Sequence, residues 1–228
     1  MIGILCALDA EVSRLYELIE DANVDVLYGY RFASGRLEGR EVVVAKCGVG
    51  KVNAAVCAQT MIMKYAPEII INSGVAGSLS PELSICDIAV GKDIVQHDVD
   101  TTACGDPVGF VSTVKTTYFP CDAGICEIIC DAAHSLGIHS IPARIASGDQ
   151  FISEHDRKRW IVDTFQAKAC EMESGAIAQT CYISGTKCAV IRAISDSTDG
   201  EHSMEFEKFL RVAADNSINV LLETLKRL

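Results

Sequence analysis

The sequence has no surplus of basic residues. Lys and Arg account for 20 of its 228 residues and Asp and Glu for 31, so the formal net charge at pH 7 is −11. Proteins that bind nucleic acids use Lys and Arg to displace counterions from the phosphates. We therefore expect no nucleic-acid partner.

Hydrophobic stretches that would cross a membrane are also absent, since a spanning helix needs about 18 or more consecutive apolar residues. The first residues, MIGILCALDAE, carry no basic cluster and run into an acidic segment, unlike a signal peptide. We expect no membrane partner and a cytoplasmic location.

Cysteine pairs of the C-x-x-C type, which mark many zinc and redox sites, do not occur among the 11 cysteines. Several cysteines instead lie inside apolar runs, where a free thiol acts as a small hydrophobic residue. These are Cys6, Cys47, Cys57, Cys170, Cys181 and Cys188. We expect reduced, structural thiols and no metal site.

The composition, 49% hydrophobic and 22% charged, is typical of a globular domain. Apolar runs predict strands at 1–8, 30–37, 41–47, 68–73, 86–90, 141–146, 167–170 and 188–191, and the start of another at 93–95. Periodic patterns predict a helix that begins near residue 9 and helices at 51–65, 122–136, 153–165, 174–183 and 203–225, whereas 101–120 is predicted as a long loop. This alternation predicts one α/β domain, residues 1–228, with three layers around a mixed sheet.

Residues 187–199, KCAVIRAISDSTD, combine an apolar run, dense enough for a strand buried on both faces, with a polar end. The polar residues are Arg192, Ser195, Asp196, Ser197, Thr198 and Asp199. Ligands of open α/β sheets bind at the carboxyl ends of the strands, so this end predicts a binding site. The alternative is that Asp196 or Ser197 merely caps the next helix.

Other strand ends carry similar residues. Glu11 begins the first helix, whose dipole favours an ionised carboxylate suited to holding a water, unless its role there is only electrostatic. Glu171 and Glu173 flank Met172, and we expect one carboxylate in the site, where vicinal sugar hydroxyls are suitable partners, and the other pointing away. Phe151 lies in the segment SGDQFI (147–152) at the end of a predicted strand, and either stacks on a flat ring or packs in the core.

Two glycine turns, GVGK at 48–51 and GVAG at 74–77, suit a close approach of the backbone to a ligand. The first is no Walker motif, because Ala45 and Val52 occupy the positions of a required Gly and of Ser or Thr. No Ser-His-Asp pattern and no Cys-His pair is present. Carboxylates, one Arg and an aromatic ring suit hydrolysis through a cationic sugar transition state, in which one acid protonates the leaving group and one carboxylate activates water.

Six segments, GILCALDAEV, KCGVGKVNAA, INSGVAG, SGDQFI, EMESGAIA and VIRAISDSTD, resemble in order the motifs of the bacterial methylthioadenosine/S-adenosylhomocysteine nucleosidases. That family has the purine nucleoside phosphorylase-type fold, so the resemblance implies a mixed and partly barrel-like central sheet. It also implies a hydrolase that releases adenine from 5′-methylthioadenosine, S-adenosylhomocysteine or both. Members are homodimers in which the partner completes part of the pocket, and they use no cofactor or metal.

The resemblance implies roles for individual residues. Asp196 is expected to protonate adenine N7, and Glu11 to act as general base for the attacking water, with Arg192 nearby. Glu173 is expected to bind the ribose hydroxyls, with Met172 against the sugar.

The remaining implied contacts surround the base and the 5′ group. Phe151 is expected to stack on adenine while the backbone of Ile152 reads its edge. The other residues implied to contact the substrate are Gly77 and Ser195, and Leu8, Val49 and Phe206 around the 5′ tail.

The sequence departs from the family pattern at two places, and both concern substrate choice. Val75 stands where the family usually has Ser, and the loop 101–120 has Cys104-Gly105-Asp106 in place of a Phe-Gly-Tyr pattern. Three alternatives therefore stay open. A nucleoside phosphorylase would need several basic groups for phosphate, of which we find mainly Arg192. The others are a hydrolase of another 5′-substituted nucleoside, such as futalosine, and a non-catalytic nucleoside sensor.

Overall fold

The computed structural model describes residues 1–196 and 202–228. The predicted polar residues Ser197, Thr198 and Asp199 lie outside the described residues. Within the described part of the chain, no helix combines the length and apolar character that crossing a membrane requires.

The strands in chain order are β1 (Ile2–Cys6), β2 (Glu20–Leu27), β3 (Tyr30–Leu37), β4 (Arg40–Lys46), β5 (Ile69–Ser78), β6 (Ile88–Gln96), β7 (Tyr118–Pro120), β8 (Ser140–Ser147), β9 (Ala169–Glu171) and β10 (Lys187–Asp196). The helices are α1 (Asp9–Leu18), α2 (Lys51–Tyr65), α3 (Ala123–Ser135), α4 (His155–Phe165), α5 (Ser174–Ser184) and α6 (His202–Arg227), with a short 3₁₀ helix η1 (Thr102–Cys104).

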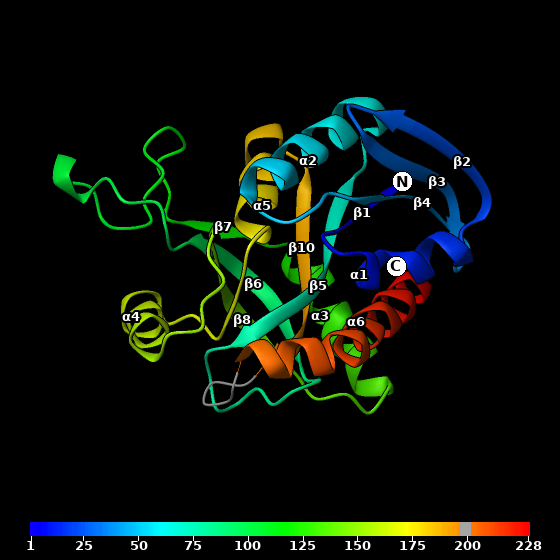
Figure 1. Cartoon of the computed structure of the whole chain (residues 1–228). Coiled ribbons are helices and arrows are strands. Elements are labelled where there is room, and N and C mark those ends of the chain that lie inside the picture. The colour runs from blue at the N-terminus through cyan, green and yellow to red at the C-terminus, as the bar shows by residue number, and fades with distance from the viewer. Residues whose placement is uncertain (197–201) are drawn as a thin grey trace.

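The strands form one mixed sheet in the order β10-β6-β8-β9-β5-β1-β4-β3-β2, with β7 paired to β6 (Figure 1). Strand β10 also pairs with β5, and this second pairing closes β5, β9, β8, β6 and β10 into a barrel. Strands β1, β5 and β10 run parallel to one another, whereas β6 is antiparallel to β10. The predicted mixed, partly barrel-like sheet is therefore confirmed.

Helices cover the sheet on two sides. Helix α6 packs against β10 and β5 and contacts α1 and α3, whereas α2 and α5 pack against each other (Figure 1). The enclosed strands carry continuous apolar runs, such as Ile69–Ile71 and Ala189–Ile191, that are almost completely buried. Such runs are typical of parallel strands covered on both faces.

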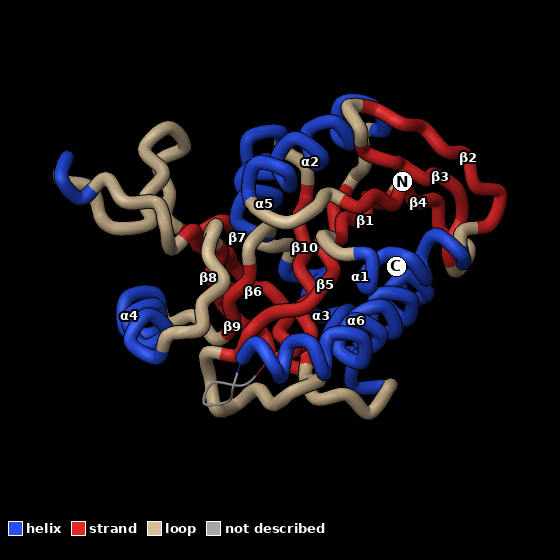
Figure 2. Tube along the Cα trace, in the orientation of Figure 1, coloured by secondary structure: helices blue, strands red, loops and turns tan. Residues whose placement is uncertain are grey.

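Two element predictions were wrong. Strand β2, EDANVDVL, was missed because it is a mostly exposed edge strand, whose alternation is limited to Ala22, Val24 and Val26 among acidic and amide residues. The strands predicted at 86–90 and 93–95 form one strand, β6, whose pairing register with β8 shifts between Gly91 and Asp93. The predicted loop 101–120 is mostly irregular and contains only η1 and the short β7 (Figure 2).

Candidate active site

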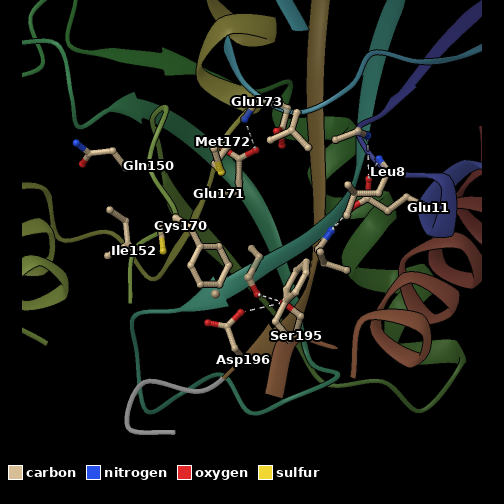
Figure 3. A pocket seen from close by; sticks show the side chains of 17 residues that line it. Leu8, Glu11, Gln150, Ile152, Cys170, Glu171, Met172, Glu173, Ser195 and Asp196 are labelled. Atoms are coloured by element: carbon tan, nitrogen blue, oxygen red, sulfur yellow. Dashed lines mark hydrogen bonds between the residues drawn. The ribbon is translucent and has the colours of Figure 1, made fainter. Parts of the chain in front are cut away.

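Several strand ends meet around one cavity of about 260 Å³ (Figure 3). The lining residues are Ala7, Leu8, Glu11, Val49, Val75, Ala76, Gly77, Gln150, Phe151, Ile152, Cys170, Glu171, Met172, Glu173, Ser195, Asp196 and Phe206. Every residue predicted for the site lines this cavity except Arg192. The chain thus brings residues from both of its ends to one place, as the strand-end pattern predicted.

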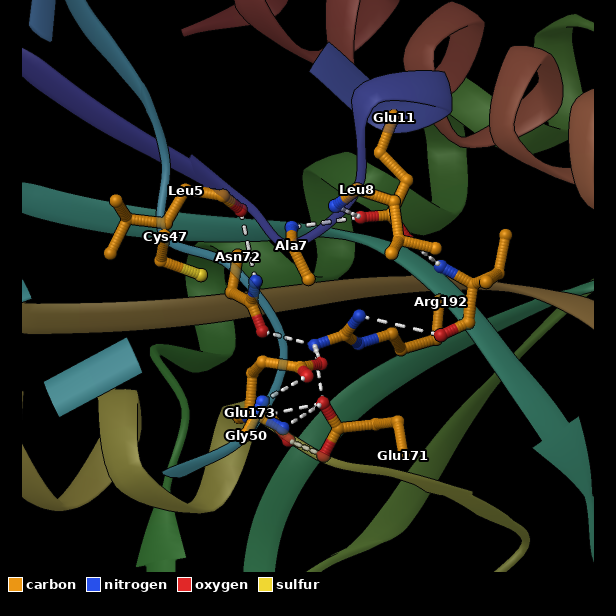
Figure 4. A network of polar contacts seen from close by, with 12 residues as sticks. Leu5, Ala7, Leu8, Glu11, Cys47, Gly50, Asn72, Glu171, Glu173 and Arg192 are labelled. Atoms are coloured by element: carbon orange, nitrogen blue, oxygen red, sulfur yellow. Dashed lines mark hydrogen bonds and ion pairs between the residues drawn. The ribbon is translucent and has the colours of Figure 1, made fainter. Parts of the chain in front are cut away.

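Glu11 lies in the first turn of α1, and its side chain is turned back toward the end of β1. One carboxylate oxygen accepts hydrogen bonds from the backbone N–H groups of Ala7, at 2.8 Å, and Leu8, at 2.9 Å. The other accepts one from Val75 N at 2.9 Å (Figure 4). Three backbone donors therefore fix the orientation of a carboxylate that is only 2% exposed.

Burial raises the pKa of Glu11 above its ordinary value, although the charge of Arg192 and the three backbone donors act in the opposite direction. The prediction from the helix start considered only the effects that favour ionisation. A base with a raised pKa is better matched to accepting a proton near neutral pH.

Arg192 does not line the cavity but lies behind it, only 1% exposed. Its Nη2 atom donates to Asn72 and Glu171 and lies 3.8 Å from Glu173 Oε2, and Nη1 donates to Val75 O at 3.3 Å. Arg192 therefore reaches a ligand only through the carboxylates that it holds.

Gly74, which pairs with Arg192 across β5 and β10, permits this packing. A Cβ atom at Gly74 would lie 2.5 Å from Glu11 Oε1 and 2.6 Å from Arg192 Nη1. The absence of a side chain here allows the Glu11 carboxylate and the Arg192 guanidinium group to approach the same strand.

Glu171, which ends β9, and Glu173, which follows it, both line the cavity, so the prediction that one points away was wrong. Strand β9 is only three residues long, and side-chain alternation does not continue into the bend after it. Glu171 accepts hydrogen bonds from Glu173 N, Ser174 N and Ser174 Oγ in addition to its ion pair with Arg192. Its oxygens are thus occupied by the protein.

Glu173 has fewer protein partners. Its Oε1 accepts a hydrogen bond from Gly50 N at 3.0 Å. Burial and the neighbouring Glu171 raise the pKa of Glu173 to about 7, against the opposing effect of Arg192. Of the two acids, Glu173 is the better placed to receive hydroxyl groups from a ligand.

Asp196 ends β10 and is 2% exposed. Its Oδ1 accepts a hydrogen bond from Ser195 Oγ at 2.9 Å, and Ser195 Oγ also lies 3.3 Å from Ala76 O. A Cβ atom on the paired Gly77 would lie 2.8 Å from Asp196 Oδ2, so the glycine leaves room for the carboxylate. Figure 3 shows Asp196 and Glu11 entering the cavity from different sides.

Apolar side chains complete the wall. Phe151 is 50% exposed, so it is not a core residue, and its ring meets that of Phe206 edge-on with centroids 5.7 Å apart. Leu8, Val49 and Met172 add further apolar surface. Such a surface suits a flat base and an apolar substituent.

Sequence reasoning missed some contributors. Asn72 holds Arg192 and donates to Leu5 O at 2.9 Å; its signal was an amide inside the apolar run of β5. Gln150 and Cys170 line the cavity but carried no distinguishing pattern. Among the residues that the structure describes, no three His, Cys, Asp or Glu side chains are grouped so as to hold a metal ion.

Known proteins resemble this chain over its whole length. The phosphorylase superfamily matches residues 1–226. The 5′-methylthioadenosine/S-adenosylhomocysteine nucleosidase of Shewanella halifaxensis is 36% identical over 229 residues, which cover 100% of this chain and 99% of the relative.

Two solved structures have the same fold. The 5′-methylthioadenosine/S-adenosylhomocysteine nucleosidase from Neisseria meningitidis, in complex with methylthio-immucillin-A, has a TM-score of 0.95 at 35% identity. The superposition covers 100% of this chain and 99% of the Neisseria chain. The futalosine hydrolase of Helicobacter pylori has a TM-score of 0.94 at 35% identity, and the superposition covers 100% of this chain and 97% of the hydrolase chain. With sequence and fold in agreement along its full length, the chain is an enzyme of the phosphorylase superfamily and belongs to its 5′-methylthioadenosine/S-adenosylhomocysteine nucleosidase family.

Proposed function

We propose that this enzyme hydrolyses the N-glycosidic bond of 5′-methylthioadenosine, S-adenosylhomocysteine or both, and releases adenine. The observation that carries the proposal is that Glu11 and Asp196 share one cavity, which they enter from different sides. Two carboxyl groups on opposite sides of a glycosidic bond are the arrangement used for its hydrolysis.

In this proposal Asp196 donates a proton to N7 of adenine as the bond to the ribose breaks, so the base leaves uncharged. Glu11 accepts a proton from a water molecule whose oxygen bonds to the sugar carbon. The hydrogen bond from Ser195 fixes the Asp196 carboxyl group, and the three backbone donors fix Glu11. Arg192 is assigned a positioning role through Glu171 and Glu173.

The remaining lining residues are assigned to binding. Glu173 receives the ribose hydroxyls beside Met172, and Phe151 stacks on adenine next to the backbone of Ile152. The other proposed substrate contacts are Gly77 and Val75 near the sugar and Leu8, Val49 and Phe206 around the 5′ tail.

Water is favoured over phosphate as the nucleophile by the charges of the cavity. Among the described residues that line it, none is Lys, Arg or His. The nearby Arg192 is committed to carboxylates, and an incoming phosphate would meet Glu11, Glu171 and Glu173 without a free cation. A phosphorylase needs basic groups in excess of acidic ones around its phosphate.

The decisive experiment follows free base from purified enzyme mixed with 5′-methylthioadenosine, S-adenosylhomocysteine or inosine, with and without phosphate. We expect adenine from one or both of the first two without phosphate. A requirement for phosphate would overturn the hydrolase assignment, and tight binding without release would indicate a sensor.

A second candidate substrate is futalosine. The Helicobacter pylori futalosine hydrolase is as similar in sequence as the nucleosidase structure is. In addition, Val75 stands where the family usually has Ser, and its backbone N–H is one of the three that hold Glu11, so a hydroxyl group is missing beside this carboxylate. Turnover of futalosine above that of 5′-methylthioadenosine would establish this alternative.

A homodimer is proposed from the exposed apolar residues of two helices that pack together. Val52 on α2 is 74% exposed and Met63 is 79% exposed, and Ile183 on the neighbouring α5 is 62% exposed. Val49, next to this surface, lines the cavity and is 45% exposed, so a partner seated here would reach the cavity mouth. Light scattering should give twice the 24.5 kDa chain mass, and a monomer would contradict the proposal.

A further inference from the structure

Three charged residues from distant parts of the chain form a closed ring of hydrogen bonds just outside the cavity. Lys51 begins α2, Asp98 follows β6, and Asp149 follows β8. Lys51 Nζ donates to Asp98 Oδ1 at 2.7 Å, Asp149 N donates to Asp98 Oδ2 at 2.9 Å, and Lys51 N donates to Asp149 Oδ1 at 2.7 Å. Each residue therefore contacts both of the others.

The ring connects two separate walls of the cavity. On one side, Gly50 directly precedes Lys51, and its N–H holds Glu173 at 3.0 Å. On the other side, Asp149 directly precedes Gln150, Phe151 and Ile152, all of which line the cavity. None of the three ring residues is itself among the lining residues.

The wall that carries Phe151 depends strongly on this ring. Residues 151–154 belong to no helix or strand. The backbone hydrogen bonds of the preceding turn run from Gly148 N to Glu171 O and from Gln150 N to Gly148 O. The hydrogen bond from Lys51 N to Asp149 links this turn to α2.

The Lys51–Asp98 pair is partly shielded from solvent, with side chains 19% and 15% exposed, whereas Asp149 is exposed. Although burial acts to raise it, the pKa of Asp98 is lowered by the hydrogen bonds from Lys51 and Asp149. Charge-assisted hydrogen bonds in such surroundings are stronger than surface ion pairs. Gln96 adds a second acceptor for Lys51 Nζ at 3.2 Å.

We propose that Lys51, Asp98 and Asp149 are positioning residues, which set the distance between the wall that carries Phe151 and the wall formed by Gly50 and Glu173. This proposal rests on the proposed function, because these walls are those assigned to adenine and to ribose. It also assigns a role other than phosphate binding to the turn GVGK: its backbone N–H groups hold two carboxylates of the protein, those of Glu173 and Asp149.

The test compares three variants with the wild type in adenine release from 5′-methylthioadenosine. Asp98→Asn removes the charge and one acceptor, Lys51→Met removes the cation but keeps the backbone N–H, and Lys51→Arg keeps the cation. Because the ring acts on both ground state and transition state, we expect Asp98→Asn and Lys51→Met to raise KM about tenfold with kcat changed less than about threefold. Lys51→Arg should restore KM to within about threefold of the wild type.

The control is Glu82→Gln, which breaks the 2.8 Å ion pair of Glu82 with Lys168; neither residue lines the cavity. It should leave KM unchanged. Melting temperatures of all variants separate folding from binding. If Asp98→Asn and Lys51→Met lower only the melting temperature and leave KM unchanged, the ring is structural and the proposal is overturned. If the wild type itself releases no base, the proposed function fails instead.

Discussion

Replacing Gly74 with Ala tests whether Glu11 and Arg192 need the space that this glycine provides. The new Cβ would lie 2.5 Å from Glu11 Oε1 and 2.6 Å from Arg192 Nη1, about 0.9 and 0.8 Å inside the 3.4 Å at which ordinary contact begins. Both side chains are almost completely buried and held by several hydrogen bonds, so neither moves freely. Overpacking of this kind costs roughly 1–3 kcal/mol of stability.

The effect on turnover should be larger than the effect on folding. A displacement of about 1 Å of a catalytic group costs about 100-fold in rate, so we expect Gly74→Ala to lower kcat by that order while the protein stays folded. The φ angle of Gly74 is not in the left-handed region, so alanine adds no backbone strain there. The measurement is adenine release combined with thermal melts followed by circular dichroism.

Gly124→Ala is the matched control. Gly124 lies in the first turn of α3, and a Cβ there would approach only Asp122 Oδ1, at 3.5 Å, which is ordinary contact. Alanine also favours the helix over glycine by about 1 kcal/mol. We expect unchanged kcat and an unchanged or higher melting temperature. If Gly74→Ala retained kcat within about threefold of the wild type, the proposed dependence of catalysis on Glu11 placement would be refuted.

Other predictions concern the acids of the cavity. Glu11→Gln and Asp196→Asn should each lower kcat about 10²–10⁴-fold while remaining folded, and either variant with retained activity would leave the mechanism without that residue. The raised pKa of Glu173, about 7 against an ordinary 4.5, means that the folded state binds this proton more tightly than the unfolded state does. Its contribution to stability is therefore lost as the pH rises from about 4.5 through about 7, so the wild-type melting temperature should fall more over this range than that of Glu173→Gln. Equal falls in the two melting temperatures would contradict a raised pKa at Glu173.

The positions of the site residues along the strands were predictable from the sequence. Apolar runs that change abruptly to polar residues located Asp196 and Glu173, and Glu11 was identified by its place at a helix start after such a run. These signals are visible in short stretches of sequence, because a strand that is buried on both faces forms a continuous apolar run. The exposed edge strand β2 has no such pattern and was missed.

The contacts among these residues were less accessible to sequence reasoning. Asp98 and Asp149 meet Lys51 only because the carboxyl ends of β6 and β8 lie beside the N-terminus of α2. The opposite directions expected for Glu171 and Glu173 assumed a longer strand than β9 provides. The position of Arg192 behind the carboxylates depends on Asn72 and on the space at Gly74, and neither is visible in a linear pattern.

The distribution of charge around the cavity connects the proposed reaction with the fold. Glu11, Glu171 and Glu173 all act on the buried cation Arg192, and Asp196 adds a fourth carboxyl group to the wall. Carboxyl groups in excess of cations stabilise positive charge that develops on a sugar as its bond to the base breaks. The same excess repels an anionic nucleophile and leaves neutral water as the suitable one. Arg192 is thus best understood as the group that allows three acids to be buried together, which explains why it lies behind the cavity rather than in it.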